Sequence, residues 1–320
     1  MKRYINLYES GELDERINAL EELLTHCCLC PWECKVNRKK GETGICQAGY
    51  DLTAAKALPH FGEEPVLTGN NGSGTIFFTH CNLRCQFCQN YQISQQHLGY
   101  PMDSGQLANA MISLQGKGCH NINFVSPTHF LPVIIKALKE AVSKGLTLPL
   151  VYNSNGYERV EILKLLDGII DIYLPDAKYG DDIRAQELSK AKHYTQYNIS
   201  ARKEMHRQVG YLKTNEKGIA ERGLIIRHLV LPHNLAETEK VLKLIKEHIG
   251  TGVHISLMGQ YFPTYLAFEN GKINRKLTTQ EYQQCLKLLD KYGFEDGWCQ
   301  EHEDIQETFV PDFARKVSWN

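Results

Sequence analysis

The sequence predicts an α/β protein with an open (β/α)6 partial barrel and an N-terminal cysteine-rich, metal-binding extension. From Gly72 onward, apolar β-branched runs alternate with helical patterns, which is typical of a parallel sheet with right-handed crossovers. The alternation yields six strand–helix units, too few for a closed eight-stranded barrel. A cluster of cysteines precedes the first unit and predicts the metal-binding extension.

The predicted division places the extension at residues 1–71, the partial barrel at 72–292 and a C-terminal cap at 293–320. An apolar stripe over residues 10–26 predicts a first helix, with Ser10 as its capping residue. Strands are predicted at residues 75–79, 121–125, 148–153, 169–174, 223–230 and 253–257. Helices are predicted near residues 103–117, 130–144, 157–167, 181–212 in one or two pieces, 236–249 and 278–291.

The segment after the first helix, CCLCPWECKVNRKKGETGIC, holds four cysteines in the spacing C-x2-C-x3-C-x11-C. These cysteines are Cys27, Cys30, Cys34 and Cys46, and Cys28 is an alternative to Cys27. Such a density of thiols predicts a metal site, which is either structural zinc or an auxiliary iron–sulfur cluster. Basic residues and the turn-forming Gly41 and Gly44 lie between them.

A second cysteine motif, THCNLRCQFCQN, follows the first predicted strand and places Cys81, Cys85 and Cys88 in the spacing C-x3-C-x2-C. Three thiolates so close in the sequence converge on one centre if the backbone loops around it. Structural zinc is normally closed by four ligands, whereas this motif leaves one position open. An iron–sulfur centre with an open position for a ligand is the alternative.

Composition limits the class of protein further. The chain has 36 basic and 37 acidic residues and a net charge of -1, so no overall field favours nucleic acid or an anionic membrane. The charged N-terminal residues do not resemble a secretory signal, and no apolar run reaches the roughly 18 residues of a spanning helix. We therefore expect a cytoplasmic protein whose 11 cysteines are metal ligands or buried thiols. The isolated Cys119, Cys285 and Cys299 are expected to be buried.

Polar residues collect where the predicted strands end, and in parallel α/β barrels this edge carries the reactive groups. Arg227 lies within an apolar strand, and its guanidinium is suited to pair directly with a carboxylate. The other candidates, from the second, third and fourth strands, are Ser126, Thr128, Asn153, Ser154, Asp176 and Lys178.

The run GSGTIFFTHCNLRCQFCQNYQISQ at residues 72–95 resembles the radical S-adenosylmethionine (SAM) enzymes. The N-terminal cysteine block makes the chain similar to an uncharacterised branch related to pyruvate formate-lyase activating enzymes. The resemblance covers nearly the whole chain and implies that Cys81, Cys85 and Cys88 hold three irons of a [4Fe-4S] cluster. SAM would chelate the open iron through its amino and carboxylate groups. In the N-terminal block, the resemblance favours Cys27 over Cys28.

The resemblance also implies site residues. Phe87 matches a position that packs near the adenine, and Asp176-Ala177-Lys178 matches a retained Asp-x-Lys, so Asp176 and Lys178 are the expected catalytic pair. The implied SAM-binding residues are Phe87, Ser126, Thr128, Asn153, Ser154, Asp176 and Arg227. Two segments depart from the family. Val125-Ser126-Pro127-Thr128 replaces Gly-Gly-Glu, and Asn153 replaces an aspartate that, in the family, helps hold a cation beside the SAM carboxylate.

The implied activity is reductive cleavage of SAM to a 5′-deoxyadenosyl radical, which abstracts a hydrogen atom from the substrate. The implied electron donor is a ferredoxin or flavodoxin, and the implied substrate is the glycine of a glycyl-radical enzyme. A small molecule or a peptide is the alternative substrate. A competing hypothesis from another class is a non-catalytic metal or electron-transfer protein with two cysteine sites.

Overall fold

The computed structural model describes residues 2–299 and 313 of the chain. Its ten-stranded sheet has the order β10-β9-β8-β6-β5-β4-β2-β1-β3, with β7 paired to β8. The strands β2 (Ser73–Phe78), β4 (Ile122–Val125), β5 (Leu150–Ser154), β6 (Ile172–Pro175), β8 (Ala220–Leu229) and β9 (His254–Met258) pair in parallel as successive neighbours. These are the six predicted strands, so the α/β class with a parallel sheet is confirmed.

Four further strands extend the sheet beyond the prediction. β1 (Thr53–His60) and β3 (Tyr100–Pro101) add an antiparallel edge beyond β2, and β10 (Gly297–Cys299) pairs in parallel with β9. β7 (Lys213–Thr214) forms a short antiparallel pair with β8. β1 falls inside the predicted extension. Its sequence, TAAKALPH, lacks apolar alternation and contains a proline. Strands tolerate proline where one side is unpaired, and on this side of β1 the strand β3 pairs only with Thr53 and Ala54.

The predicted helices are all represented, and the region 181–212 contains two. Their bounds are α2 (Glu12–Glu22), α5 (Ser104–Gly116), α6 (Leu131–Ser143), α7 (Val160–Leu165), α8 (Asp182–Ser189), α9 (Tyr194–Val209), α10 (Thr238–His248) and α11 (Thr279–Tyr292). Three further helices were not predicted: α1 (Arg3–Glu9), α3 (Pro65–Thr68) and α4 (Tyr91–Ser94). The prediction for Ser10 was wrong, because Ser10 ends α1 and Gly11, with φ of 83°, precedes α2. A left-handed backbone at that position suits glycine.

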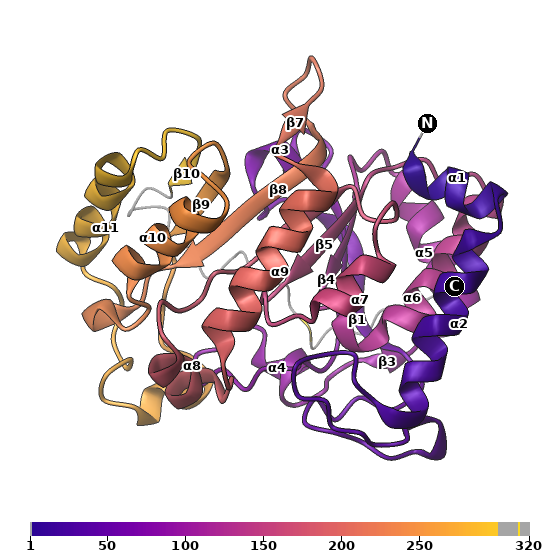
Figure 1. The fold of residues 1–320 in the computed structure, drawn as a ribbon, viewed down its shortest axis with the longest axis horizontal. Helices are drawn as coiled ribbons and strands as arrows, with labels where there is room; N and C mark the ends of the chain where they lie inside the picture. The colour runs from indigo at the N-terminus through magenta and orange to yellow at the C-terminus, as the bar shows by residue number, and fades with distance from the viewer. Residues whose placement is uncertain (1, 300–312, 314–320) are drawn as a thin grey trace.

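The N-terminal helices share the main apolar core of the barrel. Leu13 and Leu20 of α2 belong to the same buried cluster as Ile135 and Leu138 of α6, and Figure 1 shows α1 and α2 beside α6. Cys119 and Cys285 are buried as expected, whereas the prediction for Cys299 was wrong because it is exposed on β10. Over residues 2–299, no helix is both long and apolar enough to cross a membrane. Most of the predicted C-terminal cap lies outside the described residues.

The loops that follow the parallel strands gather at one end of the sheet. α4 and α8 lie at this end, at the bottom of Figure 1, and the N-terminal cysteine segment between α2 and β1 lies there too. α3 and β7 lie at the opposite end. The two cysteine motifs, which the prediction assigned to different domains, therefore lie at the same end of the fold.

Candidate functional site

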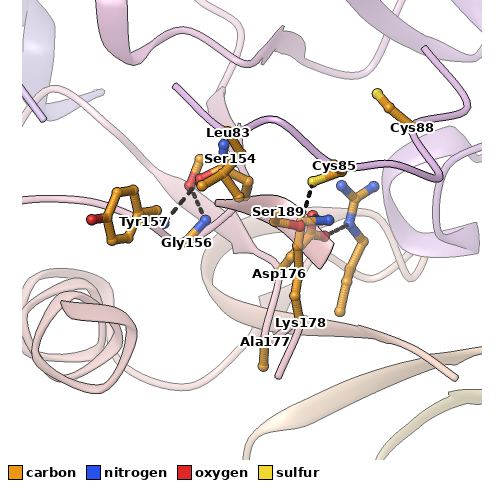
Figure 2. A network of polar contacts seen from close by, with 12 residues as sticks. Leu83, Cys85, Cys88, Ser154, Gly156, Tyr157, Asp176, Ala177, Lys178 and Ser189 are labelled. Carbon is orange, nitrogen blue, oxygen red and sulfur yellow. Dashed lines mark hydrogen bonds and ion pairs between the residues drawn. The ribbon is translucent and has the colours of Figure 1, made fainter. Parts of the chain in front are cut away.

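The loop after β2 carries Cys81, Cys85 and Cys88, and each sulfur has a hydrogen-bonding partner. The backbone N–H of Leu83 donates to Cys81 Sγ at 3.4 Å. Ser189 Oγ donates to Cys85 Sγ at 2.9 Å, a contact that Figure 2 shows as a dashed line. Cys88 Sγ lies 3.1 Å from Ser94 Oγ. Donors around thiolate sulfur favour its charged form, so the loop is suited to metal ligation.

The three thiols also affect one another. The pKa of Cys81 and of Cys85 is raised to about 11, mainly by burial, and in each case a neighbouring thiol of the motif contributes to the rise. Among residues 2–299 and 313, no three His, Cys, Asp or Glu side chains are grouped so that they could hold one metal ion. Cysteine thiolates are the ligands that iron–sulfur clusters take in proteins.

A cavity of about 200 Å³ opens beside this loop. Seven of the predicted site residues line it: Cys85, Phe87, Cys88, Asn153, Asp176, Lys178 and Arg227. Its wall is completed by residues that include His60, Glu63, Phe77, Val125, Met258 and Gln260. The enclosed space is smaller than the roughly 300–1,000 Å³ of common small-molecule pockets. Only part of a nucleoside-sized ligand would therefore fit inside it.

An ion network crosses the floor of the cavity. Asp176 Oδ2 lies 2.7 Å from Lys178 Nζ, and Asp176 Oδ1 accepts from Arg227 Nε at 3.0 Å. Arg227 Nη2 donates to Asn153 Oδ1 at 2.7 Å. Burial alone would raise the pKa of Asp176, but the charges of Lys178 and Arg227 hold it below its ordinary value. Figure 2 shows Asp176 and Lys178 together below Cys85.

Arg227 connects Asn153, which replaces an aspartate of the family, with Asp176. Its guanidinium bridges Asn153 and Asp176, and its Nη1 lies 3.6 Å from Glu63 Oε2. Where the family has an aspartate, this chain has the amide of Asn153, and that amide accepts a hydrogen bond from the positively charged Arg227.

Two acidic residues lie close to Arg227: Glu63, which lines the cavity, and the buried Glu64. Burial raises the pKa of Glu63 and of Glu64, although Arg227 opposes the effect. Glu64 is 7% exposed, and its Oε2 atom has no hydrogen-bond partner. The run GEEP resembles a solvated turn, and nothing local in it indicates an arginine more than 160 residues later in the chain.

Three predicted residues lie next to the cavity but do not line it. Thr128 Oγ1 donates to Glu158 Oε1 at 2.7 Å, and Tyr152 Oη donates to Glu158 Oε2 at 3.4 Å. Ser154 Oγ accepts from the N–H of Gly156 at 3.2 Å and also bonds to Glu158. Ser126, with φ of 56°, donates its N–H to the carbonyl of Asn153 at 2.9 Å. Thr128 and Ser154 therefore support the strand ends through a buried carboxyl group that the sequence analysis missed.

The contribution of these Glu158 contacts to stability depends on pH. Burial raises its pKa from 4.5 to about 8, with its hydroxyl partners opposing the rise. Between these values the folded protein keeps a proton that the unfolded chain releases. The contribution to stability is therefore complete below pH 4.5 and is lost as the pH rises through about 8.

We expect Glu158→Gln to remove this dependence, because glutamine does not titrate. The free energy of unfolding of the natural chain should fall by about 2 kcal/mol more than that of the variant between about pH 5.5 and about pH 7.5. Urea unfolding at both pH values measures the difference. Glu161→Gln, an exposed change on α7, is the control, and identical pH profiles for Glu158→Gln and the natural chain would contradict the assignment.

The N-terminal cysteine block also folds into a thiol-lined loop. The N–H of Lys35 donates to the carbonyl of Cys27 at 2.9 Å, and the N–H of Ile45 donates to Cys34 Sγ at 3.4 Å. Burial raises the pKa of Cys30, and the nearby thiols of Cys46, Cys27 and Cys34 raise it further. All four predicted cysteines are thus neighbours. The choice between Cys27 and Cys28 as the first ligand stays a prediction.

Similarity to known proteins agrees with this site. A family model described as the radical SAM superfamily matches residues 75–245. An uncharacterized protein of Methanocaldococcus jannaschii is 34% identical over 293 residues, which cover 88% of this chain and 80% of that protein.

Two solved structures are similar at low sequence identity. They are anSMEcpe with bound AdoMet, with a TM-score of 0.45, 15% identity and coverage of 66% of this chain, and methylornithine synthase (PylB), with a TM-score of 0.43, 14% identity and coverage of 66%. The match spans 57% and 60% of those two chains, less than two thirds of their length. Because the family model matches more than half of the sequence, and includes the C-x3-C-x2-C loop, this chain belongs to the radical SAM superfamily.

Proposed function

We propose that this chain is an iron–sulfur enzyme in which Cys81, Cys85 and Cys88 hold a [4Fe-4S] cluster and SAM binds in the adjoining cavity. The observation that carries this proposal is the meeting of the cysteine loop and a charged network at one cavity. When bound, the cluster supplies the electron that divides SAM into methionine and a 5′-deoxyadenosyl radical, and this radical takes a hydrogen atom from the substrate. Membership of the superfamily supports SAM-dependent radical chemistry.

The chain's own residues bind and orient SAM. Lys178 donates to the SAM carboxylate, and Asp176, which is bonded to Lys178 Nζ, keeps that amine protonated and directed into the cavity. Arg227 adds a second positive charge at the floor. Phe87, which is 5% exposed and packs edge-on against Tyr261, offers an apolar surface to the adenine.

The ammonium group of SAM requires acceptors, although the family's Gly-Gly-Glu segment is absent. We assign this role to backbone carbonyls of the segment 125–128 at the end of β4. The positive φ of Ser126 turns the backbone there, and the bond from Thr128 to the buried Glu158 holds the turn in place. Ser154 acts with Thr128 on the same carboxyl group.

The substrate we favour is the glycine of a glycyl-radical enzyme, with a flavodoxin or ferredoxin as electron donor. The small cavity volume favours a substrate that inserts a small group, since glycine presents only a Cα to the radical. A glycine within a peptide meets the same requirement and is the second candidate. At the N-terminal block, Cys27, Cys30, Cys34 and Cys46 hold either zinc or a second cluster.

The experiment is transfer of a label. A glycyl-radical enzyme from the same genome, deuterated at glycine Cα, is incubated with the reconstituted chain, reduced flavodoxin and SAM. We expect one deuterium in 5′-deoxyadenosine and a glycyl-radical signal in the EPR spectrum. If 5′-deoxyadenosine forms without deuterium while a glycine-containing peptide does transfer its label, the activase assignment is wrong and the peptide is the substrate.

A further inference from the structure

The last turn of α8 is bonded to the cysteine loop that follows β2. The N–H of Arg84 donates to the carbonyl of Ser189 at 3.0 Å, and the N–H of Gln86 donates to the carbonyl of Leu188 at 2.9 Å. The last carbonyls of a helix have no partner within the helix itself. The cysteine loop therefore caps α8, and these backbone bonds hold Ser189, the last residue of the helix, beside Cys85.

Two buried hydroxyl groups form a chain that ends on the sulfur of Cys85. Ser189 Oγ lies 2.9 Å from Cys85 Sγ, and Tyr179 Oη lies 2.5 Å from Ser189 Oγ; Figure 2 shows the first of these contacts. Ser189 is 0% exposed and Tyr179 is 2% exposed. A thiolate only accepts hydrogen bonds, and a serine has one hydroxyl proton. Ser189 therefore donates to Cys85, and Tyr179 donates to Ser189.

The contact at Cys85 differs from the side-chain contacts at the other two sulfurs of the loop. Cys88 Sγ lies 3.1 Å from Ser94 Oγ, and Cys81 Sγ lies 3.4 Å from Asn155 Nδ2. The bond to Cys85 is shorter than both. Its donor also receives a hydrogen bond from a second hydroxyl group, and such chains polarise and strengthen one another inside a protein.

Reduction of an iron–sulfur cluster adds negative charge to the cluster and its sulfur ligands. Hydrogen bonds to those sulfurs stabilise that charge, and they are among the features that set the reduction potential of a cluster. A donor hydroxyl that is buried and already oriented stabilises the added charge without having to reorganise.

We propose that Ser189, bonded to Tyr179, raises the reduction potential of the cluster held by Cys85, so that a one-electron donor of the flavodoxin or ferredoxin class can reduce it. This inference rests on the proposed function of the cysteine loop. Ser189 acts through Cys85 and is a positioning residue. The donor loses one electron and the cluster gains it. Both hydroxyl protons stay in place, and no bond forms or breaks.

A redox titration followed by EPR of the reduced cluster tests this role. The full chain and its variants are reconstituted with iron and sulfide without oxygen. We expect Ser189→Ala to lower the ratio of reduced to oxidised cluster at a fixed potential about tenfold, a shift of about 59 mV to lower potential. Tyr179→Phe should shift the potential in the same direction by a smaller amount. Tyr173→Phe is the matched control, because Tyr173 is also buried and donates to Gln208 Oε1 at 2.6 Å, and it should keep the natural potential.

A purely structural role of the two hydroxyl groups gives a different result. Ser189→Ala would then assemble less cluster, but the cluster that does assemble would keep the natural potential, and this outcome would overturn the inference. If Ser189→Ala does not fold, Tyr179→Phe decides, since phenylalanine keeps the ring and removes only the hydroxyl; the natural potential in that variant would also overturn the inference. A natural chain that assembles no cluster would instead contradict the proposed function.

The choice of reductant gives a second readout. With reduced flavodoxin, Ser189→Ala should form 5′-deoxyadenosine several-fold more slowly than the natural chain. With titanium(III) citrate, a stronger reductant, the two rates should be nearly equal, because the lower potential of the variant no longer limits reduction. The same loss of rate with both reductants would show that Ser189 does not act through the potential and would overturn the inference.

Discussion

Cys85→Ala is expected to abolish SAM cleavage while the chain stays folded. Cys85 is buried and accepts a hydrogen bond from Ser189. Alanine therefore removes one of the three thiolates in the loop that carries Cys81, Cys85 and Cys88. Two thiolates cannot hold the cluster that supplies the electron. The fold should survive, because the change removes one sulfur atom from a loop at the end of the strands. The measurement is 5′-deoxyadenosine formed from SAM under reducing, anaerobic conditions.

The control is a cysteine outside both motifs. Cys299→Ala changes an exposed thiol on β10 and should leave cleavage at the natural level. Circular dichroism of both variants verifies the fold. Cleavage by Cys85→Ala at the level of the control would mean that these cysteines are not the ligands.

Arg227→Gln is expected to lower the free energy of unfolding at neutral pH by about 3–5 kcal/mol, as is typical when one member of a buried ion network is removed. The change leaves Asp176 with one positive partner fewer and leaves Asn153 without its donor. It also removes the guanidinium that faces Glu63. Urea unfolding of the natural chain and the variant measures the loss.

The pH dependence of the stability lost in Arg227→Gln distinguishes the loss of charge pairing from the loss of packing. The pKa of Asp176 is lowered in the folded protein, so its contribution to stability is present above its unfolded pKa of about 3.9. It is lost as the pH falls through the lower, folded value. The penalty of Arg227→Gln should therefore shrink in acid, whereas Lys213→Gln, at an exposed position on β7, should cost little at any pH. A penalty independent of pH would indicate packing alone.

The features predictable from sequence are those with a local signature. Buried parallel strands carry short apolar runs, such as residues 224–226 in β8, and the cysteine spacing indicates a ligand loop regardless of distant neighbours. β1 lacks such a signature, because its run of alanines and its proline show neither alternation nor high β-propensity. It becomes a strand only through its pairing with β2.

The features that could not be predicted depend on partners far along the chain. Glu63 resembles a turn residue until Arg227 is brought beside it, and Glu158 resembles a surface residue until Thr128 and Tyr152 surround it. Trp32 resembles an ordinary residue between two cysteines, and its bond to Asn82 exists only because both cysteine segments reach the same end of the sheet. Each case is a polar contact created by the tertiary fold.

The central claim is tested most directly by one assay on the natural chain. The protein is reconstituted with iron and sulfide without oxygen, reduced with dithionite and supplied with SAM, and methionine and 5′-deoxyadenosine are quantified. We predict that both products form in equal amounts. A folded, cluster-loaded chain that binds no SAM and forms neither product would contradict the account and would identify the protein as a non-catalytic electron-transfer or metal-binding module.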